Sequence, residues 1–323
     1  MAKSAELIWL DAMEANEAGD RQEALALAEE VVSLDDGHSD AWFAIAQWTL
    51  PIDSRGNQMM PDMIQASKSM SAARKTVELD PQNEQAWRIG GEIMVGHLGM
   101  LEHGLEWWEG RKDAAPSDVL PYFEQVSILI RLGYFEEAGE YLDVLDGIIE
   151  SQPSKTLEAR ASRLRVIYEE QRSMEEELSF EPQNSNDDSW GLISRMRKKK
   201  PITETYFLLM FVMPIVFLLG SVAMMVVPST LIVMLLIIAM YFGIARFSRR
   251  LLLKLNRPES FLNRAIDVEC SSGKVCVPDD IRGSKLYSHV IKKRTPAFQE
   301  RLGVIEKSSE PIPRKWGLNV PEL

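Results

Sequence analysis

This sequence contains one long stretch without any charged or ionisable side chain of the Asp, Glu, Lys, Arg or His type. Thr205 to Ala245 contains 41 consecutive residues without Asp, Glu, Lys, Arg or His. A single helix of that length would measure about 60 Å, roughly twice the hydrocarbon thickness of a bilayer. Two helices, Tyr206 to Val227 and Thr230 to Phe247, would each have about the right length, with the chain breaking at Pro228. The pattern predicts two membrane spans joined by a short turn, and a buried helical hairpin in a large soluble core is the alternative.

Thiols and catalytic motifs are also scarce. Cys270 and Cys276 are the only cysteines, and no secretory signal is recognisable, so the soluble parts are expected to face a reducing compartment. Two thiols fall short of the four ligands of a structural zinc site, and the four histidines show no metal or triad spacing. There is no phosphate-binding loop, nucleophile elbow or HExxH motif. We therefore expect no enzymatic activity, no cofactor and no metal, and interpret the thiols as structural, with redox or metal roles as the alternative.

Acidic and basic residues are unevenly distributed along the chain. Residues 1–180 carry a net charge of −20 and residues 181–323 carry +8, which together give the −12 of the whole chain. Nucleic acids and anionic lipids both present phosphates, which repel an acidic surface. We therefore expect no nucleic-acid partner and an acidic segment that stands away from a membrane surface.

Basic residues flank the charge-free stretch on both sides, whereas the turn within it has none. Positive residues stay on the cytoplasmic side, so the sequence predicts a multi-pass protein of the cell membrane with two spans and both termini in the cytoplasm. The same residues are candidate contacts for anionic lipid headgroups, and stop-transfer anchors without a lipid preference are the alternative. They are Arg195, Arg197, Lys198, Lys199, Lys200, Arg246, Arg249 and Arg250.

Small residues mark one level of the two predicted spans. Ala239 and Gly243 form a small-xxx-small pair on the second span, and Gly220 and Ser221 lie at about the depth of Ala239 in an antiparallel hairpin. Small residues let helix backbones approach closely in a membrane. We interpret them as the packing contact between the two spans, with a dimer face as the alternative.

Residues 1–180 show helical periodicity and an internal repeat of about 34 residues. The clearest unit is AGDRQEALALAEEVVSLDDGHSDAWFAIA, from Ala18 to Ala46. Further units contain AARKTVELDPQNEQAW, from Ala72 to Trp87, and RLGYFEEAGEYLDVLDG, from Arg131 to Gly147. Amphipathic helix pairs of this kind cannot bury a core alone and therefore stack on their neighbours.

These motifs resemble the tetratricopeptide repeat (TPR), in which an aromatic begins helix A, a Gly precedes helix B, and Asp-Pro ends it. The resemblance covers roughly residues 6–150, with a degenerate third repeat and an insertion, Leu50 to Asp62, inside the second. It implies an all-α solenoid of helical hairpins. It also implies a concave groove lined by helix A. The corresponding row here is Trp9, Met13, Phe43, Gln47, Arg88, Glu92 and Phe123. Such residues suit an apolar peptide or helix as partner, and the alternative is that the aromatics belong to the core.

The remaining segments complete the predicted domain organisation. We expect the solenoid with a capping helix over 1–180, a polar linker and basic segment over 181–200, the transmembrane hairpin over 201–247, and a basic cytoplasmic tail over 248–323. Ser248 to Asn263 reads as an interfacial amphipathic helix or as the frayed end of the second span. The run AIDVECSSGKVCVPDD is predicted to form two short strands around a turn, and the Pro-rich remainder to be partly irregular.

The function predicted from these features is that of a membrane-anchored, TPR-like scaffold or adaptor that binds a cytoplasmic protein through its groove. The alternative is an accessory or assembly subunit of a membrane transport or secretion complex, whose transmembrane hairpin makes the main contact. The partners expected are an unidentified peptide, helix or membrane complex, and the lipid bilayer. An enzyme acting through the cysteine region ranks last.

Overall fold

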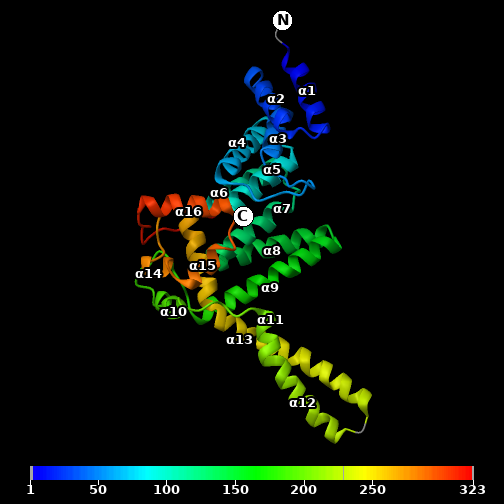
Figure 1. Ribbon diagram of the computed structural model, residues 1–323, viewed down its shortest axis with the longest axis vertical. Coiled ribbons are helices and arrows are strands. Elements are labelled where there is room, and N and C mark those ends of the chain that lie inside the picture. The colour runs from blue at the N-terminus through cyan, green and yellow to red at the C-terminus, as the bar shows by residue number, and fades with distance from the viewer. Residues whose placement is uncertain (1–2, 228, 322–323) are drawn as a thin grey trace. The chain divides into compact units, whose positions relative to one another are not determined.

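The computed structural model describes residues 3–227 and 229–321. The fold is all-α, and the β-structure among these residues amounts to two isolated bridges, between Ile52 and Gln58 and between Val275 and Pro311. The chain divides into two compact units (Figure 1). The first unit comprises residues 1–171, 264–277 and 291–323, and the second comprises 172–263 and 278–290.

The first unit begins with a series of helices that each pack on the next along the chain. Each helix must bury one apolar face, and sequential pairing lets every face find a neighbour. The helices are α1 (Ala5–Glu17), α2 (Arg21–Leu34), α3 (Ser39–Trp48), α4 (Met63–Leu79), α5 (Glu84–Gly91) with its π-helical continuation η1 (Glu92–His97), α6 (Leu101–Ala114), α7 (Leu120–Leu132) and α8 (Phe135–Ser151).

Short polar side chains begin several of these helices. Ser4, Asp20 and Asn83 accept hydrogen bonds from backbone N–H groups at the starts of α1, α2 and α5. Asp62 and Gln65 form a reciprocal capping box at the start of α4. These contacts satisfy donors that the first helical turn leaves unpaired. The capping box explains why α4 begins at Met63, directly after the loop 49–62 that follows α3.

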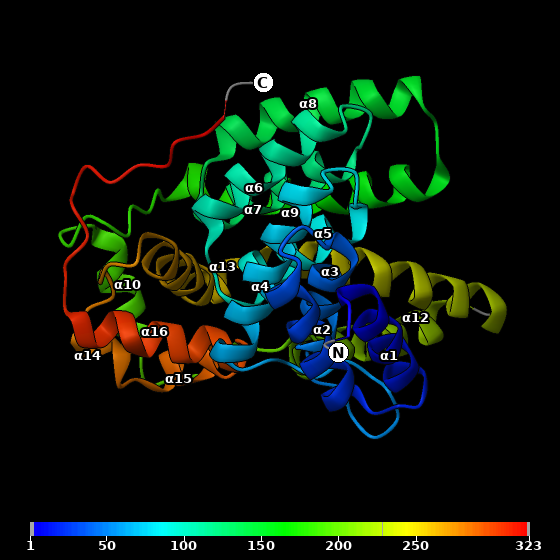
Figure 2. The same cartoon turned by 90° about the horizontal axis from the view of Figure 1, so that it is seen from above.

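The helix α9 (Lys155–Glu177) follows α8 and lies alongside it in both views (Figures 1 and 2). Tyr168 of α9 packs its ring against Phe135 of α8, with ring centroids 6.5 Å apart. Arg165 forms an ion pair with Asp146. Residues 155–171 of α9 thus cover the face of α8 and close this end of the first unit.

C-terminal segments complete the core of the first unit. Val268, Ala297 and Ile312 are buried in the same hydrophobic cluster as the side chains of α5 to α9. Ala297 comes from α16 (Pro296–Ser308), and Ile312 comes from the extended segment that follows it. The tail is partly irregular, as predicted, because residues 309–321 form no helix. It nevertheless contains helices and supplies apolar surface to the core of the helical series.

The predicted strand pair around Ser272 and Gly273 is also wrong. The helix α13 runs from Thr230 to Ser272 without a break, and the residues after it form turns and short helices. Residues 264–271 are buried on every side. Alternating apolar positions are typical of a strand with one face exposed to solvent. Here the end of the helix is surrounded by protein, so the polar residues of the run are buried together with the apolar ones.

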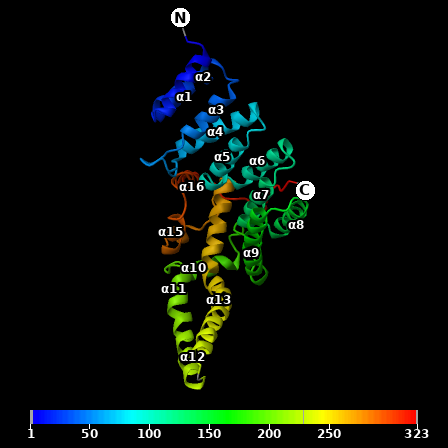
Figure 3. The same ribbon diagram turned by 90° about the vertical axis from the view of Figure 1, so that its right-hand side faces the viewer.

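The second unit contains the apolar helices. It comprises α10 (Asp188–Met196), α11 (Glu204–Phe207), the π-helical segment η2 (Leu208–Val212), α12 (Met213–Val226), α13 as far as residue 263, α14 (Asp279–Arg282) and most of α15 (Lys285–Ile291). Among the described residues, two helical stretches are long and apolar enough to cross a membrane, Glu204–Val226 and Thr230–Ser272. The first stretch and the beginning of α13 lie side by side in Figures 1 and 3.

The helix bounds in this unit agree with the sequence predictions at the break between the two apolar helices and differ from them in the linker. The chain leaves helical structure between Val226 and Thr230, as predicted, and Pro228 itself lies outside the described residues. Residues 248–263 are helical, as the first interpretation predicted, and they continue α13 without a break, so the alternative of a frayed end is wrong. In the predicted linker, residues 181–187 form turns, but α10 begins at Asp188 and buries Trp190 against Phe180, with ring centroids 5.1 Å apart.

Candidate interaction surfaces

The predicted groove row divides into buried and exposed members. Phe123, on α7, has only 1% of its surface exposed and lies in the main core of the first unit. The guanidinium of Arg160 lies over its ring at 4.4 Å, and Arg160 also donates a 2.7 Å hydrogen bond to Glu124. The prediction of Phe123 as a groove residue is wrong, because α9 covers the face of α7 on which it lies.

The aromatics at the start of the row are partly interior. Trp9 is half-buried and stacks on Trp48, with ring centroids 6.1 Å apart and planes inclined by 18°. Its ring also lies 5.2 Å from that of His38. Phe43 is half-buried against the main core. Trp9 and Phe43 therefore stabilise contacts between neighbouring helices, as the alternative interpretation of the row held.

The remaining members of the row are more accessible. Met13 is exposed on α1, and Arg88 and Glu92 are exposed on α5 and η1. Arg88 forms an ion pair of 2.6 Å with Glu84 one helical turn away. Gln47 is half-buried, and its carbonyl accepts a hydrogen bond from Arg21.

Two leucines that the sequence analysis did not select accompany Met13. Leu10 is 62% exposed and Leu7 is 54% exposed, whereas Ile8 and Ala12 on the same helix are buried. Residues 7, 10 and 13 recur at a spacing of three, which places them on one side of α1. The spacing is visible in the sequence, but apolar residues at this spacing are equally typical of the face that a helix buries. The structure places an apolar stripe of Leu7, Leu10 and Met13 on the surface.

The C-terminal half of the helical series is covered by the protein's own chain. The thiol of Cys270 donates to the carbonyl of Leu98 over 3.3 Å, and the amide of Glu102 donates to the hydroxyl of Ser271 over 2.9 Å. The extended end of the chain lies across α8, where the hydroxyl of Tyr141 donates to the carbonyl of Pro321 over 2.9 Å. The surface of α5 to α8 is thus partly occupied, whereas Leu7, Leu10 and Met13 of α1 are exposed.

The two cysteines are free thiols with different surroundings. Cys270 is fully buried, and burial raises the pKa of its thiol to about 11, although the nearby guanidinium of Arg301 opposes the shift. Cys276 is half-buried, and its thiol donates to the carbonyl of Ala265 over 3.2 Å. Across residues 3–227 and 229–321, no group of three or more His, Cys, Asp or Glu side chains could hold a metal ion. The geometry fits packed thiols.

The predicted headgroup contacts of the second unit fall into two classes. Arg197 pairs with Asp280 at 3.1 Å. Beyond the predicted set, Glu177 accepts from both Lys254 and Arg257, at 2.9 and 2.5 Å, and these two cations lower the pKa of the Glu177 carboxyl. The other members of the predicted set are exposed, and they are Arg195, Lys198, Lys199, Lys200, Arg246, Arg249 and Arg250.

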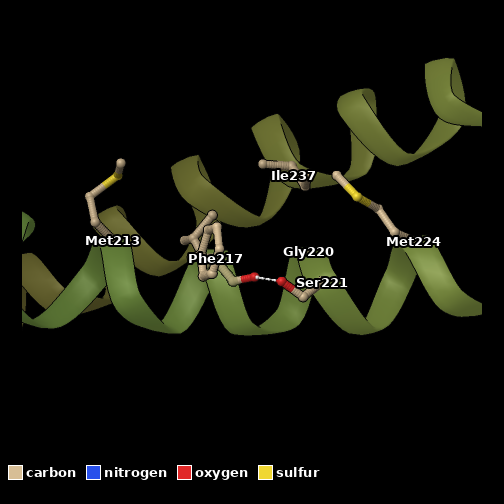
Figure 4. A pocket seen from close by; sticks show the side chains of 7 residues that line it. Met213, Phe217, Gly220, Ser221, Met224 and Ile237 are labelled. Atoms are coloured by element: carbon tan, nitrogen blue, oxygen red, sulfur yellow. Dashed lines mark hydrogen bonds between the residues drawn. The ribbon is translucent and has the colours of Figure 1, made fainter.

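The small residues predicted to join the two apolar helices behave differently from one another. Gly220 is buried, and a Cβ atom there would lie 2.9 Å from a side-chain carbon of Ile237 on α13. The hydroxyl of Ser221 donates to the carbonyl of Phe217 on its own helix over 2.8 Å (Figure 4). Ala239 and Gly243 are exposed, so their predicted role in this contact is wrong. The helices approach each other at Gly220 and Ile237, two residues before the predicted Ala239.

An apolar cavity of about 170 Å³ accompanies that contact. Figure 4 shows Met213, Phe217 and Met224 of α12 around it, with Ile237 of α13 opposite Gly220. Its lining offers one hydroxyl, which is already bonded to the helix backbone. It is therefore a gap between two apolar helices without the polar groups that orient a ligand.

Comparisons with known proteins give little guidance. No family model matches this chain, and no curated protein matches it. Among solved structures, a chain described as "MamA RS-1 ArsTM double mutant" is similar over 54% of this chain and 99% of its own, with 15% sequence identity and a TM-score of 0.31. A TM-score at that level supports no transfer of fold or function.

Proposed function

We propose that this chain is a membrane-anchored scaffold of TPR-like helical repeats that binds a protein partner through the open, N-terminal end of its helical series. The observation that carries the proposal is the apolar stripe of Leu7, Leu10 and Met13 on α1. Exposed apolar surface of this kind is typical of an interaction site. The proposal assigns the chain no catalytic role and no cofactor.

Occupancy favours this end of the series over the other, and charge indicates the kind of partner. The segment 1–180 carries a net charge of −20, which favours a partner with basic residues around apolar anchors. The other end, at α5 to α8, is already in contact with residues 264–277 and 291–321 of the same chain. An amphipathic helix with a basic polar face is the partner that fits both features.

Membrane anchoring is supported by the two long apolar helices and their basic flanks. In the proposed topology both termini face the cytoplasm, because the positive residues lie at the outer ends of the hairpin. Tags fused to the two ends, probed with a protease on intact and on opened cells, test it. Digestion of either tag on intact cells would contradict the topology, and recovery of the chain in the supernatant after ultracentrifugation would contradict the anchoring.

Site-specific photo-crosslinking tests the partner site. A photoreactive residue at position 10 of the full-length chain, in its native membrane, is expected to give a discrete adduct that mass spectrometry identifies. The full chain is required because Val268, Ala297 and Ile312 complete the core of the first unit. The variant Leu10→Asp/Met13→Asp should lose the adduct at a reporter on Leu7. Leu34→Asp, at a leucine 58% exposed on α2, is the matched control and should retain it.

A second candidate function has its own supporting observation. Ala239 and Gly243 present a small-residue face that is not used by α12, and many side chains of both apolar helices are exposed. An accessory or assembly subunit of a membrane transport or secretion complex would use this face against other spans. Loss of function on replacing Ala239 and Gly243 by Leu, with the α1 adduct retained, would favour this candidate.

A further inference from the structure

Hydrogen bonds fix how the two apolar helices are aligned. The side chain of Asn256 on α13 holds the backbone of Ile202 with two hydrogen bonds, donating to its carbonyl over 2.8 Å and accepting from its amide over 3.0 Å. Further along, Gly220 faces Ile237. Leu252 shares a buried cluster with Phe207, which agrees with the same register. The two helices are antiparallel. A step of one residue toward the C-terminus on the first helix is therefore matched by a step of one residue toward the N-terminus on α13.

This register places arginines beside apolar residues. Moving from the Ile202–Asn256 contact toward the turn sets Arg250 level with Leu208, and Arg246 level with Val212. At that level the first helix exposes Leu209, Met210 and Phe211. Apolar residues continue from Val212 back to Thr205, about 10 Å along the helix at ~1.5 Å per residue. Arg246 therefore lies about 10 Å inside the charge-free length of the neighbouring helix, and Arg250 lies about 4.5 Å inside it.

The two arginines also share one side of α13. Residues four apart are neighbours on a helix surface, and two positive charges at that spacing destabilise a helix unless an anion lies between them. Both side chains are exposed. The acids near other cations of the second unit are already engaged, Glu177 with Lys254 and Arg257 and Asp280 with Arg197.

We propose that Arg246 and Arg250 form a binding site for the phosphate of an anionic glycerophospholipid on the outer side of α13. The proposal rests on the membrane anchoring proposed above. At the level of Leu209 and Phe211, lipid is the surrounding solvent, and arginine extends its guanidinium toward the headgroups. Guanidinium groups bind phosphate oxygens with two parallel hydrogen bonds each, and one phosphate between the two side chains would relieve their repulsion.

The experiment uses the full-length chain reconstituted into vesicles of phosphatidylglycerol and phosphatidylcholine in equal amounts. After mild detergent extraction, the ratio of the two lipids retained by the protein is measured by mass spectrometry. Arg246→Gln/Arg250→Gln is expected to lower the retained phosphatidylglycerol ratio by about fivefold or more, because it removes both guanidinium groups and with them the charged hydrogen bonds to the phosphate.

A matched control separates a site from general attraction. Lys198→Gln/Lys199→Gln removes the same amount of charge from exposed residues on the other flank. These lysines belong to the predicted headgroup set, but a lysine lacks the two-point contact with phosphate, so this variant is expected to change the ratio by less than twofold. An equal fall in both variants, or an unchanged ratio in the arginine variant, overturns the proposal. If the arginine variant fails to insert, Arg246→Lys/Arg250→Lys keeps the charge and decides the question. Lysine lacks the two-point contact, so a ratio equal to wild type overturns the site.

Failure of the membrane proposal gives a different result. If the wild-type chain enters neither these vesicles nor vesicles of phosphatidylcholine alone, the anchoring itself is wrong, and the lipid site falls with it. If the wild-type chain enters both but retains the two lipids equally, the anchoring stands and the site at Arg246 and Arg250 is overturned.

Discussion

Arg131 and Asp267 form a two-point ion pair between α7 and the end of α13. The Nε atom and one terminal nitrogen of Arg131 lie 3.2 and 2.9 Å from the two carboxylate oxygens, and Arg294 reaches the same carboxylate at 3.1 Å. The Asp267 side chain is 5% exposed. One buried carboxylate therefore holds two arginines and ties residues 264–277 and 291–323 to the helical series.

Replacing that carboxylate should destabilise the first unit. Asp267→Asn replaces the carboxylate that Arg131 and Arg294 share with a neutral amide. The two positive charges then lack a buried counter-charge, which should lower the free energy of unfolding by about 3 kcal/mol. We expect an apparent melting temperature lowered by roughly 6–12 °C in detergent. Asp143→Asn, the same change at an exposed position on α8, should alter stability by less than about 0.5 kcal/mol. Equal melting temperatures for the two variants would contradict the role of the pair.

Gly99 is expected to tolerate no side chain. Its φ of +65° is unfavourable for other residues, and a Cβ atom would lie 2.3 Å from the ring of Phe298 and 3.0 Å from the sulfur of Cys270. Gly99→Ala should therefore destabilise the protein by about 3 kcal/mol or more. Gly96→Ala, where a Cβ meets nothing within 4 Å, should be neutral or slightly stabilising. Thermal unfolding of the two purified variants checks the contrast.

The two thiols should differ in reactivity. Cys270 is buried with a pKa raised to about 11, so it should resist alkylation at neutral pH while Cys276 reacts first. Peptide mass spectrometry after timed labelling measures the difference, and unfolding the protein should remove it. Faster labelling of Cys270 than of Cys276 in the folded protein would contradict the buried position.

The same raised pKa has a consequence for stability at high pH. The folded state holds the Cys270 proton more tightly than the unfolded state, in which the pKa is about 9. The contribution to stability is therefore complete below pH 9 and is lost as the pH rises through about 11. Cys270→Ser replaces this thiol with a group that does not titrate in the range. Its melting temperature should fall less than that of wild type between pH 9 and 11.

The extended end of the chain should loosen when its hydrogen bond to Tyr134, the residue before α8, is removed. The amide of Leu318 donates to the hydroxyl of Tyr134 over 2.7 Å. Tyr134→Phe leaves that amide without its acceptor, at a cost of about 1 kcal/mol. Hydrogen exchange of residues 310–321 should become faster by roughly fivefold. Tyr122→Phe on α7, whose ring lies against Lys112, is the matched control and should leave that exchange unchanged.

The helical character of the chain is largely readable from local pattern. Apolar residues at spacings of three and four in 1–180, and an uncharged stretch interrupted near Pro228, predict helices and a break that the helix bounds confirm. The exposure of the groove residues is predicted less well from the sequence, because exposure depends on which helix covers which face. Phe123 has the spacing of a groove residue, yet α9 lies over it.

By itself, the sequence determined that this protein is built of helices, that two of them share a long charge-free stretch, and that acidic and basic residues gather in different halves. Those properties follow from spacing and composition along a single segment. Only the tertiary structure decided that residues 264–277 and 291–321 belong to the core of the first unit, and that Asp267 pairs with Arg131. Contacts between distant segments depend on which faces meet in space, and local spacing carries no record of that choice.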